Sequence, residues 1–137
     1  MSCKKILIAV ITALFLIVAL TACDSAEEPG ISFIDWNNHD LRAEQFVVAL
    51  LNGDFSTAAE GFDEEMRHAL SVSELRKAWR DTVRVAGEFV SIERAEVVPH
   101  EDYEIYNVIT RHATRDINTR IVFSFDGKVA GLFFSFI

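Results

Sequence analysis

The chain has 137 residues, of which half are hydrophobic and a quarter are charged. This length suits a single domain, and the apolar content is enough for a packed core, which excludes a mainly disordered chain. The formal net charge is −8. An acidic surface repels nucleic-acid phosphates and disfavours lying flat on anionic lipid, so the sequence predicts no nucleic-acid partner.

Residues 1–22 have the organisation of a secretory signal peptide. Lys4 and Lys5 form a short positive head, and an apolar run of about 17 residues follows from Ile6 to Ala22. A charged head, an apolar stretch and small residues before a cleavage site are typical of such signals. The next tetrad, Leu20-Thr21-Ala22-Cys23, resembles the lipobox of bacterial lipoproteins. The alternatives are an uncleaved signal anchor, or an ordinary signal peptide with a coincidental cysteine.

The lipobox resemblance implies cleavage between Ala22 and Cys23, with a diacylglycerol on the Cys23 thiol and an acyl chain such as palmitate on the new amino terminus. Two or three chains on one residue make release from a bilayer slow. We therefore expect a lipid-anchored protein that faces the extracytoplasmic side of the cell membrane. In a host with two membranes, Asp24 resembles the signal that retains lipoproteins at the inner membrane.

The sequence offers little for cofactor or nucleophile chemistry. Cys3 leaves with the signal and Cys23 is consumed by lipid, so residues 24–137 have no cysteine for a disulfide or a metal. The four histidines lack the spacing of a metal site, and His100-Glu101-Asp102 fits a solvated turn better than a ligand set. No nucleophile elbow or phosphate-binding glycine loop is present. We therefore predict no catalytic residue, no metal and no cofactor.

The mature chain divides into a lipidated tether over residues 23–38 and one domain over residues 39–137. Pro29, Gly30 and their charged neighbours are typical of a linker. Phe33, Ile34 and Trp36 are unusually apolar for such a segment, which suggests that they dock on the domain.

Helical spacing of apolar residues predicts helices in the first half of the domain. The first runs over about 41–51, with Asp40 as its cap and Gly53 as its left-handed stop. Shorter helices follow near 55–62 and 63–70. Ser71 and Glu74 have the spacing of a capping box, which opens a longer helix over about 72–86 that ends at Gly87.

From residue 88 onward, β-branched and aromatic residues predict four strands, over 88–98, 103–112, 117–125 and 128–136. Asp126-Gly127 between the last two predicts a two-residue hairpin. That turn would pair Phe123 with Ala130 and Ile121 with Leu132, and would place Phe125 on the apolar face and Val129 on the opposite one. The fold class is therefore α+β, with N-terminal helices packed on a curved antiparallel sheet of about four strands.

Several short segments together resemble a known family. They read AEQFVVALLNGDF, GFDEEM, LRKAWRDTV, AGEF and RIVFSFDGKVAGLFF, and they extend from Leu41 to Phe134. They are similar to uncharacterised extracytoplasmic domains of the cone-shaped ketosteroid-isomerase and nuclear-transport-factor-two-like superfamily. Such domains occur in small lipoproteins and ahead of α/β-hydrolase domains. The resemblance implies a cone-shaped, cystatin-like fold, and it carries over no catalytic residue.

A cone fold can enclose an apolar cavity between helices and sheet. The strand register places Tyr106 and His112 on the inner face, where either could orient a ligand or exchange protons. The candidate pocket consists of aromatic and imidazole side chains: Trp79, Tyr106, His112, Phe123 and Phe134. The competing interpretation is that these side chains simply fill the core, and aromatic residues at strand spacing usually do.

Two functions from different classes remain open. The first is a binding or interaction module at the membrane surface, whose partner is an apolar ligand, a peptide, an envelope protein or a second copy. Val122, Ser124 and Phe133 on the outer face would suit a homodimer formed through the sheet. The alternative is a small-molecule enzyme of the isomerase or hydratase kind, which needs an ionisable pair inside a cavity. Function has to be argued from a site, so we favour the binding module.

Overall fold

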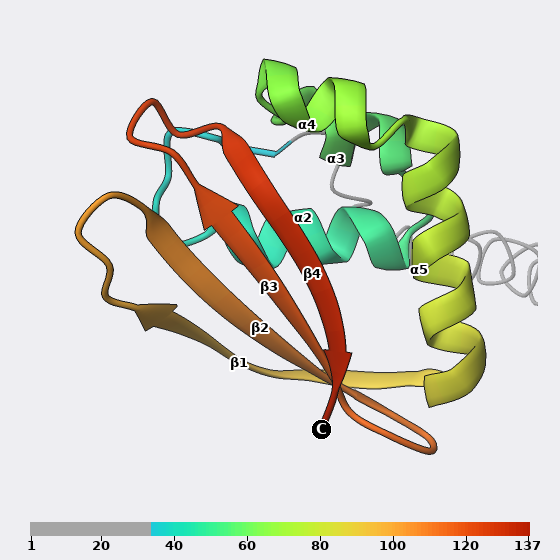
Figure 1. Ribbon diagram of the computed structural model, residues 1–137. Coiled ribbons are helices and arrows are strands. Elements are labelled where there is room, and N and C mark those ends of the chain that lie inside the picture. The colour runs from blue at the N-terminus through green and yellow to red at the C-terminus, as the bar shows by residue number, and fades with distance from the viewer. Residues whose placement is uncertain (1–33) are drawn as a thin grey trace, which may run out of the picture. The chain divides into compact units, whose positions relative to one another are not determined.

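The computed structural model describes residues 34–137, and Figure 1 shows helices followed by strands, as the sequence predicts. The predicted signal peptide, the predicted lipidation site Cys23 and Phe33 lie outside this part of the chain. The helices of residues 34–137 are α2 (Arg42–Leu51), α3 (Phe55–Glu60), α4 (Glu64–Ala69) and α5 (Val72–Ala86). The strands are β1 (Phe89–Val98), β2 (Glu104–His112), β3 (Ile117–Phe123) and β4 (Val129–Phe136).

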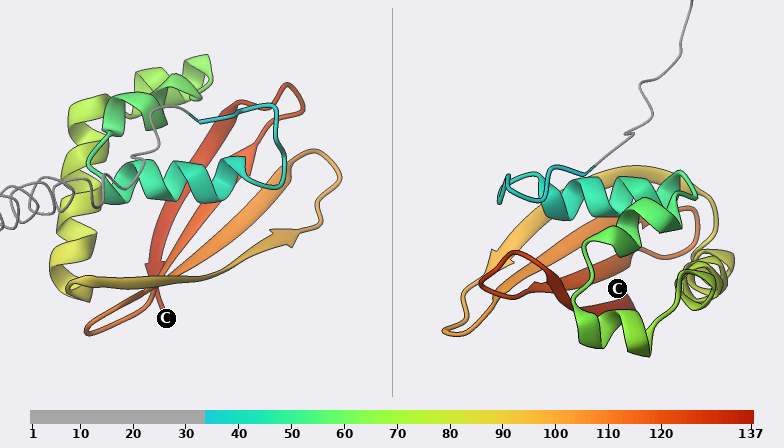
Figure 2. Two further views of the ribbon diagram at one scale, coloured as in Figure 1. Left: turned by 180° about the vertical axis from the view of Figure 1, so that it is seen from behind. Right: turned by 90° about the horizontal axis from the view of Figure 1, so that it is seen from above.

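The strands form one antiparallel sheet in the order β1-β2-β3-β4, so each strand pairs with its neighbour in sequence. The helices lie on one face of this sheet, with α2 across it and α5 beside it (Figures 1 and 2). Helix α2 contacts β1 and β2, whereas α4 and α5 contact β4. The predicted α+β class, with helices packed on a curved four-stranded antiparallel sheet, is therefore confirmed.

The covered face of the sheet carries the predicted residues of β2. Tyr106 pairs with Ile121 and Thr110 pairs with Ile117, which fixes the side-chain alternation. Side chains at alternate positions on β2 and β3 are all buried against the helices: Tyr106, Val108, Thr110, His112, Ile117, Thr119, Ile121 and Phe123. The core lies between this face and α2, α3 and α5.

The capping box predicted for α5 is confirmed. The Ser71 hydroxyl accepts a hydrogen bond from the Glu74 amide at 3.2 Å, and the Glu74 carboxylate accepts one from the Ser71 amide at 2.8 Å. The cap predicted for the first helix is wrong. Leu41 occupies the N-cap position and makes no side-chain cap, while the Asn38 carbonyl accepts the amides of Leu41 and Arg42. A backbone turn thus takes the role that we assigned to Asp40.

The β3–β4 hairpin differs from the predicted two-residue turn. The Ser124 amide donates to the Lys128 carbonyl at 2.9 Å, and the Gly127 amide donates to the Ser124 carbonyl at 2.8 Å. Gly127 has a φ of 78°, so the loop has three residues and ends in a left-handed glycine. Asp126-Gly127 does mark the turn, but the loop is one residue longer than its sequence suggested.

The longer loop changes the register only at the end of the hairpin. Ile121 pairs with Leu132 as predicted, but a bulge follows, and Phe123 pairs with Val129 instead of Ala130. Val129 is therefore fully buried, although we placed it on the outer face. Phe125 falls in the loop and is 81% exposed, although we placed it on the apolar face.

The segment before α2 packs against the helices. Ile34 is buried in the core, and Trp36 lies edge-on to Phe46 with the ring centres 6.5 Å apart. The Trp36 ring also covers Gly61, where a side chain would collide with it. The predicted docking is confirmed for Ile34 and Trp36, so the packed body includes residues that the sequence assigned to the tether. Within residues 34–137, none of the helices has the length and hydropathy that crossing a bilayer requires.

Candidate functional site

The five side chains of the predicted pocket lie in two groups. Trp79 lies 6.5 Å from His112 and 5.3 Å from Phe134, measured between ring centres. Tyr106 and Phe123 meet edge-on at 5.7 Å. Tyr106 and His112 are six positions apart on β2, which is about 20 Å along an extended strand. They cannot act together on one small ligand.

His112 has both ring nitrogens engaged by the protein itself. Nδ1 lies 2.9 Å from the Gly87 carbonyl oxygen, which can only accept, so Nδ1 carries the proton. Nε2 lies 3.1 Å from the Thr110 hydroxyl, which can donate to it. This arrangement ties the end of β2 to the residue that terminates α5. The contacts give His112 a structural role.

Tyr106 belongs to a polar cluster at the other end of β2. Burial raises the pKa of its phenol, the nearby Glu104 carboxylate raises that pKa further, and Arg42 opposes both. A phenol with a raised pKa holds its proton more tightly, so it is a poorer proton donor than a free tyrosine.

Arg42 is the residue of this cluster that our sequence reasoning missed. Its side chain is 1% exposed and lies over the Phe123 ring, 4.0 Å from the ring centre. One guanidinium nitrogen donates to the Glu104 carboxylate, while Nε and Nη1 have no hydrogen-bond partner among the described residues. A signal was present in the sequence, because residue 42 precedes the buried Phe46 and Leu50 at intervals of four on one helix face.

Glu104 links this cluster to the exposed surface. Both of its carboxylate oxygens lie 3.1 Å from Nδ1 of His39, and one also accepts from Arg42. The residue precedes Tyr106 by two positions, so it shares the covered face of β2, but it is the first residue of that strand and its side chain is partly exposed. Arg42, Glu104 and His39 therefore join the turn before α2 to the start of the second strand.

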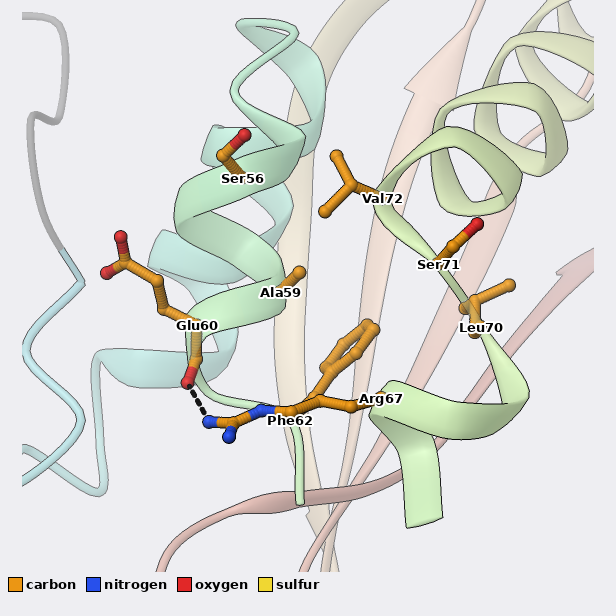
Figure 3. A pocket seen from close by; sticks show the side chains of 8 residues that line it. All are labelled: Ser56, Ala59, Glu60, Phe62, Arg67, Leu70, Ser71 and Val72. Carbon is orange, nitrogen blue, oxygen red and sulfur yellow. Dashed lines mark hydrogen bonds between the residues drawn. The ribbon is translucent and has the colours of Figure 1, made fainter. Parts of the chain in front are cut away.

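Two grooves open on the helical layer. The first has a volume of about 430 Å³ and lies between α3 and the corner where α4 meets α5 (Figure 3). Phe62, Leu70 and Val72 supply apolar walls. Arg67 donates to the Glu60 carbonyl at 3.3 Å, across one end of the groove. The groove is lined by Ser56, Ala59, Glu60, Phe62, Arg67, Leu70, Ser71 and Val72.

The second groove has a volume of about 340 Å³ and lies between the end of α2, the start of α3 and the middle of α5. It contains Trp79, the one residue of our predicted pocket that lines either of these grooves. Its lining combines apolar side chains with two arginines: Leu50, Gly53, Phe55, Trp79, Arg80, Val83 and Arg84. The sequence reasoning did not select these arginines, although their spacing of four residues on α5 could be read directly.

The described residues show no arrangement for metal chemistry. In residues 34–137, no group of three or more His, Cys, Asp and Glu side chains could hold a metal ion. At His100, the ring nitrogen Nδ1 accepts the Asp102 amide at 3.2 Å, and the ring lies beside Tyr103. What the helical layer offers instead is two apolar grooves with polar or charged rims, an arrangement suited to binding.

The chain is similar to one segment of a longer curated protein. The chain is 30% identical over 95 residues to Esterase EstD of Thermotoga maritima. The match covers 69% of this chain but 23% of the esterase, so the chain spans less than a quarter of that relative. No solved structure matches the chain significantly.

A family model matches residues 43–132, which include all of α2 except its first residue, α3 to α5 and most of the sheet. The matched segment contains the lining of both grooves and also Trp79, Tyr106, His112 and Phe123 from the predicted pocket. The chain therefore belongs to the family described as Protein of unknown function (DUF3887).

Proposed function

We propose that the protein is a lipoprotein, anchored to the extracytoplasmic face of the cell membrane, whose domain is a non-catalytic binding module. The observation that carries the binding role is the pair of open, apolar-floored grooves on the helical layer. The candidate acid–base residue His112 is held by protein contacts, and Tyr106 lies about 20 Å from it along the strand. Concave apolar sites with few polar groups are the usual form of a ligand site.

The anchoring rests on the sequence alone. Leu20-Thr21-Ala22-Cys23 follows a positive head and an apolar run, and these are the features that a lipoprotein signal requires. In a host with two membranes, Asp24 favours the inner membrane. We also propose the cone-shaped superfamily of the resemblance as the home of this fold, because helices cover one face of an open, curved sheet.

The test of the anchor compares two cysteine variants. Cys23→Ala should abolish incorporation of radiolabelled palmitate and leave an unprocessed precursor or release the domain from membranes. Cys3→Ala is the matched control, since that residue leaves with the signal, and it should be processed and acylated normally. Mass spectrometry of the native amino terminus gives the same answer independently. An intact Met1 without acyl mass would refute the lipoprotein.

We further propose a homodimer formed through the outer face of the sheet. Phe133 is 61% exposed there, and a hollow lies on each side of it. One hollow is lined by the acidic Asp63 and Glu65, and the other by Arg120. A two-fold axis near Phe133 would place the acidic side of one copy against the basic side of the other.

Sedimentation velocity over a range of concentrations tests this dimer. Phe133→Glu should shift the protein to the monomer at concentrations where the wild type associates. Phe125→Glu adds the same charge to the exposed hairpin loop and should leave association unchanged. A wild-type protein that stays monomeric at all concentrations would exclude the dimer.

The alternative function is a small-molecule enzyme of the isomerase or hydratase kind. The observation that favours it is the buried Tyr106 phenol beside the Glu104 carboxylate and the Arg42 guanidinium. It would require a substrate to reach that cluster. A Tyr106→Phe variant that loses an activity measured in the wild type, with unchanged stability, would favour the enzyme over the binding module.

A further inference from the structure

A row of arginines runs along α5 in a protein that is otherwise acidic. Arg76, Arg80 and Arg84 are exposed and recur every four residues, so successive side chains start about 6 Å apart on one side of the helix. Arg80 and Arg84 line the second groove, and Arg76 lies over the Phe55 ring at 5.5 Å. The row therefore follows the groove along its length.

The positive charge of this row is only partly balanced. Arg84 pairs with Asp81 at 3.0 Å, and Lys77 pairs with the same carboxylate at 2.6 Å. Among the residues that the structure describes, neither Arg76 nor Arg80 takes part in an ion pair. The rim thus has basic groups available for an anionic partner, whereas the whole chain carries a formal charge of −8.

The floor of the groove is apolar. Leu50 and Phe55 contribute from α2 and α3, and Trp79 and Val83 contribute from α5. A ligand that fits would insert an apolar group between the helices and present negative charge to the arginines beside it. Guanidinium groups bind carboxylates with two parallel hydrogen bonds, which adds geometric selectivity to charge attraction.

We propose that this groove binds an acidic amphipathic helix of a partner protein, a proposal that rests on the domain being a binding module. Carboxylates at every fourth position of a helix are also about 6 Å apart, so they match the arginine row along α5. An adjoining apolar stripe on the same helix would place its side chains in the groove. The carboxylates of such a helix would pair with Arg76, Arg80 and Arg84.

An anionic lipid surface fits these observations less well. A bilayer is flat on this scale, whereas the groove is concave and its floor lies below the arginines. A membrane would also bring its charge close to the acidic remainder of the domain, and the resulting repulsion opposes contact. A narrow helix touches only the basic rim and the floor, so it avoids that cost.

The experiment uses the full chain in phosphatidylcholine nanodiscs and a fluorescently labelled synthetic helix. The probe carries Glu at every fourth position and Leu on the adjoining stripe, and its control carries Lys in place of Glu. Fluorescence anisotropy should show binding of the Glu probe alone, and raising the salt from about 50 to 300 mM should weaken it severalfold. In a Trp36→Phe variant, Trp79 is the single tryptophan, and its emission should shift when the probe binds.

Charge reversal separates the groove from general electrostatics. Arg80→Glu with Arg84→Glu should weaken the Glu probe at least about tenfold and should allow the Lys probe to bind. Arg94→Glu with Arg111→Glu makes the same change of charge on the sheet, away from the groove and from Phe133, and should leave both probes unaffected. Equal loss in both double variants, or no binding by the wild type, would overturn the proposal.

A last measurement, with vesicles of phosphatidylglycerol and phosphatidylcholine, tests whether the groove binds an anionic lipid surface instead of a helix. If the chain bound these vesicles through Arg80 and Arg84 but ignored the Glu probe, the partner would be a lipid surface, and the helix proposal would fail. None of these outcomes depends on acylation of Cys23, so failure of the anchor and failure of the groove proposal can be told apart.

Discussion

The guanidinium of Arg42 lies 4.0 Å from the centre of the Phe123 ring, and its Nη2 donates to the Glu104 carboxylate. The arginine is fully buried, but the glutamate side chain is 41% exposed. The two partners therefore differ in what each would lose if the other were removed. Glu104 would regain water, whereas Arg42 would remain buried without a counter-charge.

We expect Glu104→Gln to be much more destabilising than Arg42→Met. Loss of the carboxylate leaves a buried cation uncompensated, which typically costs about 3 kcal/mol of unfolding free energy. Methionine can fill the space over Phe123, so the cost of Arg42→Met should stay below about 1.5 kcal/mol. Urea unfolding of both variants and of the double variant measures the difference. Equal losses would show that Arg42 finds other partners.

Gly61→Ala should be destabilising, because the added methyl group would overlap the Trp36 ring. Displacing the indole should cost about 1–3 kcal/mol, in the range of overpacked cores. Gly53→Ala is the matched control, since its new side chain meets nothing within 4 Å but its φ is 75°. That change should cost about 1 kcal/mol from backbone strain alone. Adding Trp36→Ala should remove much of the Gly61→Ala effect, and strict additivity would contradict the contact.

The capping box of α5 predicts a pH dependence. The Ser71 amide, and then its hydroxyl, lower the pKa of Glu74 below its ordinary value. The ionised form is therefore favoured in the folded state, and the stabilisation is present above the unfolded pKa, near 4.5. It is lost as the pH falls through the folded value. The stability difference between wild type and Glu74→Gln should shrink as the pH falls below about 4.5 and should vanish below the folded pKa, and a constant difference would exclude this origin.

At alkaline pH, the ionisation of Tyr106 should make the folded state less stable as the pH rises. Burial raises its pKa above the ordinary value near 10, so its stabilising contribution is complete below that pH and is lost as pH rises through the folded value. The chain has two tyrosines, so Tyr103→Phe leaves Tyr106 as the single phenol. Its absorbance near 295 nm should titrate later than that of free tyrosine. Titration at the ordinary pH would show that the phenol is solvated.

Local patterns predicted most of the fold because each one depends on few residues. The α5 helix begins and ends where Ser71 and Gly87 place it, and the alternation along β2 identified its buried side chains. The hairpin register was harder, because two-residue and three-residue loops share the same Asp-Gly signal and differ by one position. The extra loop residue shifts the pairing at the end of the hairpin by one position, so Val129 faces the core.

The site was less predictable because its residues come from distant parts of the chain. Arg42 and Glu104 are 62 positions apart. Both are charged, so hydrophobic patterning does not place either of them near the core. The second groove exists only where α2, α3 and α5 meet. Trp79 lines this groove, whereas the sequence placed it in a cavity between helices and sheet together with Tyr106 and His112.

The meander order of the sheet has a consequence for how the chain folds. Every strand pairs with its neighbour in sequence, so only short loops have to close when the sheet forms. Closing short loops costs little chain entropy. The ion pair between Arg42 and Glu104 and the bridge between Phe62 and Val129 instead join the helices to distant strands. We expect the hairpins to assemble early and these two contacts to form last, as the step that commits the molecule to its native state.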